Sequence, residues 1–284
     1  MKKHTIIYLI LIILSLALLV GYETLDNLRT DTAAPKITVD ESILEIPTLS
    51  GEDALLQGVS AWDNVDGDVT ASLVVESVRL ANSDGTVAVS YAAFDRAGNV
   101  AKASRNLRVA DYESPKFSLS RSLTFPSGRE QNLFSYISAQ DAMDGNISHR
   151  IRATTLSSTA LSNPGIHEVE FRVSNSLGDT AKLVVAVEIY NGTPYDATLY
   201  LTDYIVYLNE GESFSPNRYL KELVAGASVI SLTGGLPQGI NVQTTGTVDT
   251  QTPGTYPVAY LVTQTLENGR RYSGYARMTV VVED

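Results

Sequence analysis

The feature that most constrains the fold is a stretch at residues 85–109 that recurs at 164–187 and, more loosely, at 253–282. Each copy consists of two runs of alternating apolar and polar residues joined by a turn, which is Asp95 to Asn99 in the first copy. Alternation with a period of two is typical of a strand with one face against a core and the other in water. The recurrence therefore predicts a series of similar β-modules.

The first two copies are related by a constant offset in the numbering, which aligns Gly85 with Gly165 and Gly98 with Gly178. The alternation also predicts which side chains of each hairpin face the core. These positions are Val87, Val89, Tyr91 and Ala93 in the first copy, His167, Val169, Phe171 and Val173 in the second, and Tyr256, Val258, Tyr260 and Val262 in the third.

Several short β-patterned runs separated by turn residues, without helical periodicity, fill each copy and are typical of an Ig-like β-sandwich. We therefore predict an all-β chain in which three tandem Ig-like β-sandwich modules follow a single N-terminal transmembrane helix. The predicted boundaries are 1–22 for a membrane anchor or signal sequence, 23–33 for a spacer, 34–111 for the first module, 112–190 for the second and 191–284 for a divergent third module.

The N-terminal residues indicate where the protein is located. Lys2 and Lys3 precede an uncharged apolar run, residues 5–22, which as a helix would be about 27 Å long, close to the thickness of a bilayer core. No small-x-small cleavage pattern follows directly. We expect a single-pass anchor in the cell membrane with the lysines in the cytoplasm and the C-terminal modules extracellular. The alternative is a cleaved signal peptide.

The composition excludes several classes of function. The chain contains no cysteine, which excludes disulfides, thiol catalysis and a lipoprotein anchor. Its net charge of −11 repels phosphate backbones, so we expect no nucleic-acid binding. Outside the N-terminal tail the only histidines are His149 and His167, and no nucleophile, base and acid form a recognisable set. We therefore expect that the protein is not an enzyme.

A second motif, Asp63-Asn64-Val65-Asp66-Gly67-Asp68-Val69-Thr70, precedes the first hairpin. Together with that hairpin it resembles the bacterial Ig-like module of pesticidal crystal proteins and the related hyalin repeat. The resemblance weakens along the chain, because the second module has Asn146 and Asn175 where the first has Asp68 and Asp95, and the third keeps only the hairpin. It implies cell-surface display, with a role in adhesion or as a spacer, and no catalytic residue.

Four carboxylates of the first module are candidate calcium ligands: Asp63, Asp66, Asp68 and Asp95. Calcium prefers several carboxylate and carbonyl oxygens, although their spacing does not match an EF-hand loop. The alternative is that Asp and Gly simply form a tight turn in which the Asp side chains accept local N–H groups. The two Asn replacements make a corresponding site in the second module less favourable.

Tyrosine is concentrated in the third module, where exposed rings would stack on sugars or anchor a protein partner, unless they only pack within the sheet. We therefore predict a membrane-anchored bacterial cell-surface protein whose Ig-like modules form a stalk or adhesion surface, with a protein or glycan ligand at the third module. The alternative is a carbohydrate- or calcium-binding module protein that assists a surface enzyme. The nine tyrosines are Tyr195, Tyr200, Tyr204, Tyr207, Tyr219, Tyr256, Tyr260, Tyr272 and Tyr275.

Overall fold

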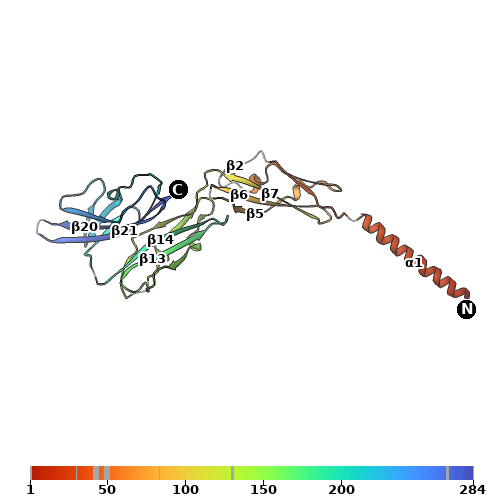
Figure 1. Ribbon diagram of the computed structural model, residues 1–284, viewed down its shortest axis with the longest axis horizontal. Helices are drawn as coiled ribbons and strands as arrows, with labels where there is room; N and C mark the ends of the chain where they lie inside the picture. The colour runs from red at the N-terminus through yellow and green to blue at the C-terminus, as the bar shows by residue number, and fades with distance from the viewer. Residues whose placement is uncertain are drawn as a thin grey trace. The chain divides into compact units, whose positions relative to one another are not determined.

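The computed structural model describes residues 2–29, 31–40, 45–47, 52–82, 84–128, 131–192, 194–266 and 269–283. Most of these residues lie in β-strands, as predicted (Figure 1). The chain divides into two compact units, Met1–Tyr112 and Glu113–Asp284. The first unit holds one β-module, and the second unit holds two further hydrophobic cores.

The first element is the helix α1 (Lys2–Arg29), which continues past residue 22 into residues that the sequence analysis assigned to a spacer. Residues 23–29 contain no Gly or Pro that would end a helix. In the part of the chain that the structure describes, no helix is both long enough and apolar enough to cross a membrane. The predicted transmembrane span through residues 5–22 is therefore not supported.

The first module is a β-sandwich of two sheets, with strand orders β1-β3-β4 and β2-β7-β6-β5. Buried residues of both sheets, such as Ala61 and Tyr91, form its core. Its strands are β1 (Lys36–Val39), β2 (Glu45–Ile46), β3 (Val59–Asp63), β4 (Gly67–Asp68), β5 (Val74–Leu80), β6 (Thr86–Phe94) and β7 (Val100–Val109). Two short helices, α2 (Glu52–Leu56) and the 3₁₀ helix η1 (Thr70–Ser72), lie between strands.

The second module repeats this topology, with strand orders β11-β10-β8 and β12-β13-β14-β9. Its strands are β8 (Lys116–Leu119), β9 (Thr124–Pro126), β10 (Ile137–Asp141), β11 (Gly145–Asn146), β12 (Arg152–Thr155), β13 (Gly165–Ser174) and β14 (Thr180–Tyr190), with 3₁₀ helices η2 (Leu133–Ser135) and η3 (Ser148–Arg150). The hairpin register is also the same, since Thr86 pairs with Arg108 and Ile166 pairs with Glu188. The structural repeat predicted from the constant offset is confirmed.

The predicted inward faces are confirmed as well. All eight of the predicted core positions in the first two hairpins are buried, including His167. Both hairpins turn through a glycine in the left-handed region, Gly98 with a φ of 89° and Gly178 with a φ of 85°. Residues with a Cβ rarely adopt this conformation, which explains why a glycine stands at both positions.

The third module is a single seven-stranded sheet with the order β18-β17-β15-β21-β20-β19, in which β16 also pairs with β21. Its strands are β15 (Ala197–Leu201), β16 (Ile205–Asn209), β17 (Leu220–Ala225), β18 (Ser228–Ser231), β19 (Ile240–Thr245), β20 (Gly254–Thr265) and β21 (Arg271–Glu283), with the 3₁₀ helix η4 (Pro216–Tyr219) before β17. Val258, Tyr260 and Val262 are buried as predicted, and Tyr256 is half-buried.

The second and third modules are joined by polar contacts as well as by apolar packing. The Glu188 carboxylate in β14 accepts hydrogen bonds from the Tyr275 hydroxyl and from Arg277 Nε in β21, both at 2.6 Å. The Phe117 N–H donates to the Tyr207 hydroxyl at 2.8 Å. Burial raises the pKa of Tyr207 to about 12, so this hydroxyl stays neutral. Tyrosines of the third module therefore help to build the junction between the two modules.

Candidate cation site at one end of the first module

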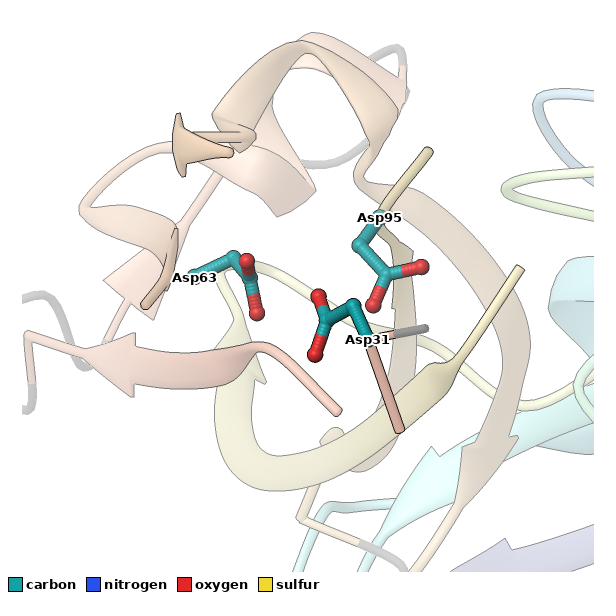
Figure 2. Close-up of side chains that lie close together, drawn as sticks. All are labelled: Asp31, Asp63 and Asp95. Atoms are coloured by element: carbon teal, nitrogen blue, oxygen red, sulfur yellow. The ribbon is translucent and has the colours of Figure 1, made fainter. Parts of the chain in front are cut away.

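Three aspartates from different segments of the first unit converge on one point (Figure 2). Asp31 lies between α1 and β1, Asp63 is the last residue of β3, and Asp95 directly follows β6. Each offers a carboxylate oxygen, and these oxygens all lie within 4.8 Å of one another. Oxygens grouped in this way are the ligands that a hard divalent cation prefers.

The cluster is shielded from water, and part of it has no hydrogen-bond donor. Asp63 is 1% exposed and Asp95 is 8% exposed. Oδ2 of Asp63 and Oδ2 of Asp31 are buried and have no hydrogen-bond partner among the residues that the structure describes. Buried polar atoms are nearly always paired, and an unpaired buried carboxylate oxygen is especially unfavourable. These two oxygens are therefore positioned to bind a cation.

The local backbone holds Asp63 in its ionised form. Its Oδ1 accepts the N–H groups of Asp66 at 2.9 Å and of Val65 at 2.8 Å, which form a turn after β3. These hydrogen bonds lower the pKa of Asp63 below its usual range, although burial opposes the shift. The turn thus uses one carboxylate oxygen and leaves the other directed at Asp31 and Asp95.

Asn99 fixes the other two aspartates. Its backbone N–H donates to Asp95 Oδ1 and its side-chain amide donates to Asp95 Oδ2, both at 2.7 Å. The same amide donates to the carbonyls of Asp31 at 3.1 Å and Ala33 at 3.2 Å. The segment before β1 is therefore bound to the turn between β6 and β7, which places Asp31 beside Asp95.

The four predicted metal ligands separate into two pairs. The structure brings Asp63 and Asp95 together. Asp66 instead accepts the Arg96 N–H at 2.7 Å, and Asp68 accepts the Thr70 N–H at 2.9 Å at the start of η1. Asp68 thus takes the turn-forming role that the sequence analysis gave as the alternative to calcium binding, whereas Asp66 binds the turn that follows β6.

Asp31 was missed because it lies in the stretch that was assigned to a spacer. One signal was available in the sequence: the offset that aligns Gly85 with Gly165 also aligns Asp31 with Asp111. The same offset relates the landmark pairs Pro35-Lys36 and Pro115-Lys116. A repeat search that began before Pro35 would have included this aspartate.

The second module keeps the turn, but both carboxylate oxygens of its aspartate have hydrogen-bond donors within the module. Asp141 Oδ1 accepts the N–H groups of Met143 at 2.9 Å and Asp144 at 2.8 Å, as Asp63 does in the first module. Its Oδ2, however, accepts a hydrogen bond at 3.0 Å from the amide of Asn175. Asn175 stands at the position of Asp95, so an amide here supplies the partner that Asp63 Oδ2 lacks.

The histidines have ordinary surroundings. His167 is buried, and its Nε2 lies 2.8 Å from the Asn163 carbonyl. His149 is exposed on η3. The buried histidine therefore has the hydrogen-bonded structural role that is usual for this residue in a core.

No family model matches the chain, and no curated protein matches it in sequence. Among solved structures, it is similar to the extracellular domain of protocadherin GammaB4, with 11% identity, a TM-score of 0.20 and 90% of this chain covered. For Drosophila N-cadherin EC1-4 the identity is 12%, the TM-score 0.22 and the coverage 88% of this chain and 76% of that chain.

A third match is the M60 catalytic domain of Clostridium perfringens ZmpB with its CBM51-1 and CBM51-2 domains, with 12% identity, a TM-score of 0.23 and 89% of this chain covered. This chain spans 51% of the protocadherin chain and 31% of the ZmpB chain. TM-scores of this size support no inference about function. The relation to pesticidal crystal protein modules and hyalin repeats stays a prediction.

Proposed function

We propose that this chain is a calcium-binding β-sandwich protein that serves as a stalk or interaction surface outside the cytoplasm. The observation that carries the proposal is the convergence of Asp31, Asp63 and Asp95 with two buried carboxylate oxygens that lack a hydrogen-bond partner. A bound cation would satisfy both oxygens and neutralise the repulsion among three carboxylates.

The ligand set favours calcium over softer metals. The cluster contains only carboxylates, whereas zinc and copper sites are built mainly from His and Cys. Calcium accepts six to eight oxygens in a flexible arrangement, while magnesium requires a nearly ideal octahedron and keeps several waters. Asp31 is only half-buried, so water can complete the coordination shell from its side. Extracellular calcium-binding modules work at about 0.1 to 1 mM calcium, which suits display outside the cell.

Calcium at this point would link three parts of the first unit. Asp31 lies two residues after the end of α1, Asp63 ends β3 in one sheet, and Asp95 directly follows β6 of the other sheet. A cation bound to all three would fix the segment that enters the module to both sheets. A stalk benefits from this arrangement, because its attachment segment becomes stiff only where calcium is abundant.

The test is unfolding of the purified full-length chain in CaCl₂ and in EGTA, followed by tryptophan fluorescence. Trp62 is the only tryptophan of the chain and directly precedes Asp63, so its signal reports the first module. Calcium at a hundredfold excess over its Kd should add about 2.7 kcal/mol to the free energy of unfolding. MgCl₂ at the same concentration should add clearly less. An unfolding midpoint that calcium leaves unchanged up to about 10 mM, roughly ten times the Kd of the weakest extracellular modules, would refute the proposal.

Matched variants locate the effect. Asp63→Asn keeps an oxygen for the turn but removes the carboxylate, so it should abolish the calcium response. Asp141→Asn makes the same change in the second module, and Asp68→Asn removes a carboxylate that accepts the Thr70 N–H in the turn before η1. Both should respond to calcium as the unmodified chain does. If Asp68→Asn abolished the response instead, the site would involve the Asp-Gly turn and not the three-aspartate cluster.

Display outside the cytoplasm is tested independently. Protease added to intact cells should remove the modules that follow residue 33, and carbonate washing of membranes should show whether the chain stays attached. Complete protection from protease in intact cells, with cleavage after lysis, would exclude an extracellular stalk.

A further inference from the structure

A cavity of about 500 Å³ lies within the second unit, between the second and third modules. Its wall includes four tyrosines: Tyr136 from the second module, and Tyr200, Tyr204 and Tyr275 from the third. Pockets of about 300 to 1,000 Å³ are the usual size for small-molecule ligands. The cavity can therefore enclose a ligand of about two sugar rings.

The two modules build this cavity rigidly. Tyr275 is held from two sides, because its hydroxyl donates to Glu188 and its ring stacks on Tyr195 with a centroid distance of 5.0 Å. The Tyr204 hydroxyl accepts the Leu201 N–H at 3.2 Å. Both hydroxyls are thus engaged within the protein, and the rings are fixed in place. Tyr200 also lines the cavity and is 40% exposed.

Arg121 is the charged residue of the cavity wall. Its guanidinium lies over the rings of Tyr136 at 5.2 Å and Phe125 at 5.6 Å, which orient it. No ion pair between Arg121 and a carboxylate is found among the residues that the structure describes. On a chain with a net charge of −11, this site therefore presents an oriented cation for an anionic group.

We propose that this cavity binds a saccharide that carries a carboxylate group, with Arg121 pairing to the carboxylate and Tyr200 stacking on a sugar face. A guanidinium binds carboxylates with two parallel hydrogen bonds, and tyrosine rings pack against the apolar faces of sugars while hydroxyl groups serve the sugar edges. The wall supplies such hydroxyls from Ser135 and Thr198. The site is separate from the cation cluster, so neither proposal depends on the other.

An acidic peptide would offer the same charge to Arg121. The wall favours a saccharide, because its side chains are mainly rings and hydroxyls, with Leu199 as the aliphatic residue among them. A peptide of comparable size would need apolar pockets for its side chains or an exposed strand edge for its backbone. Competition by an acidic peptide is therefore an outcome that the experiment must include.

The experiment applies the full-length chain to a glycan array with uronic-acid, sialic-acid and neutral glycans, followed by titration with digalacturonic acid and with its methyl ester. We expect acidic glycans to bind, and we expect the ester, which keeps the shape but lacks the charge, to bind at least tenfold more weakly. Arg121→Gln should weaken binding of the acid by tenfold or more and leave binding of the ester nearly unchanged. Tyr200→Ala should weaken both.

The controls separate this site from general electrostatics. Arg270 stacks on Tyr272 at 4.8 Å in the third module, so Arg270→Gln makes the same charge change beside a tyrosine elsewhere. Glu222 pairs with Tyr200 across the sheet, and Glu222→Gln should strengthen binding of the acid because it removes a nearby negative charge. Near-ultraviolet circular dichroism of the tyrosines verifies that each variant is folded.

Several results would overturn the proposal. Binding of neutral glycans alone, or of no glycan, contradicts it directly. Equal losses in Arg121→Gln and Arg270→Gln would show that the charge acts without a specific site. Displacement of the saccharide by tetraglutamate at equal concentration would assign the cavity to an acidic peptide.

Discussion

The first and second modules have the same strand order and the same hairpin register, but they differ at the buried polar positions. Where the first module places Tyr91 and Arg105, the second places Phe171 and Val185. Where the first has Asp95 and Asn99, the second has Asn175 and Asp179. The comparison shows that one scaffold accepts either a polar network or an apolar core, provided that the partners change together.

The Arg105 network illustrates this rule. Arg105 is buried, and its guanidinium donates to the Tyr91 hydroxyl at 2.8 Å, to the carbonyls of Leu55 and Gln57 at 2.9 Å, and to the Asp40 carbonyl at 3.2 Å. It thereby ties α2 and the end of β1 to the central hairpin. The second module has no guanidinium at this place, and Phe171 and Val185 belong to its apolar core.

The largest expected effect comes from breaking this network. Arg105→Met should lower the free energy of unfolding of the first module by about 3 kcal/mol, because the Gln57 carbonyl loses its guanidinium donor and the Leu55 carbonyl keeps only the Tyr91 hydroxyl. Urea unfolding followed by Trp62 fluorescence measures the loss. Arg108→Met, at an exposed position of the same strand, should change the midpoint little. A loss below about 1 kcal/mol in Arg105→Met would mean that water replaces the guanidinium.

The next largest effect is expected when the first module is given the residues that the second module has at positions 175 and 179. Exchanging Asp95 and Asn99 in the double variant Asp95→Asn/Asn99→Asp keeps the net charge and places an amide beside Asp63 Oδ2. The stabilisation by a hundredfold excess of calcium should then fall from about 2.7 kcal/mol to near zero. Urea unfolding in CaCl₂ and in EGTA measures this. A variant that still responds fully to calcium would show that the exchanged position is not a ligand.

The reverse change in the second module should have a somewhat smaller effect on stability. Asn175→Asp removes the amide that donates to Asp141 Oδ2 and sets two buried carboxylates against each other, which should cost about 2 kcal/mol in EGTA. Calorimetry of the full-length chain measures the loss. Asn146→Asp is the matched control, since Asp68 Oδ1 accepts the Thr70 N–H in the first module as Asn146 Oδ1 accepts the Ser148 N–H in the second. Equal losses in the two variants would contradict the assignment of a special role to position 175.

The smallest expected effect concerns pH. Hydrogen bonds from the side chain and the backbone N–H of Thr70 lower the pKa of Asp68, so its ionised form adds stability above its unfolded pKa of about 4. This contribution is lost as the pH falls through the lowered folded pKa. Asn146 accepts the equivalent N–H of Ser148 without titrating, so Asp68→Asn should reduce the loss of first-module stability between about pH 4 and pH 2.

Urea midpoints followed by Trp62 fluorescence at about pH 7, 4 and 2.5 give the comparison, because this range includes the ordinary aspartate pKa of about 4. Asp203→Asn, at an exposed position in the third module, is the charge-matched control and should leave the pH dependence of the first module unchanged. If Asp68→Asn lost more first-module stability in acid than the unmodified chain, the result would contradict the lowered pKa of Asp68.

The alternating patterns determined the hairpins, their inward faces and their left-handed glycine turns, because each of these features depends on neighbouring residues along one strand or turn. The same holds for the turn at Asp63, whose acceptor role needs only the next three residues. The constant offset between the first two copies determined that these modules share a topology, since equal patterns at equal spacing fold alike.

Only the tertiary structure decided which carboxylates meet. Asp63, Asp66 and Asp68 are close in sequence, yet Asp68 accepts the nearby Thr70 N–H, Asp66 accepts the Arg96 N–H in the turn after β6, and the partners of Asp63 are Asp31 and Asp95 from distant segments. Such convergence depends on how two sheets bring the ends of β3 and β6 and the residues before β1 to one place. The cavity beside Arg121 has the same origin, because its wall combines residues from two modules. Local patterns determine strands and turns, whereas a site formed by several strands exists only once the sheets have packed.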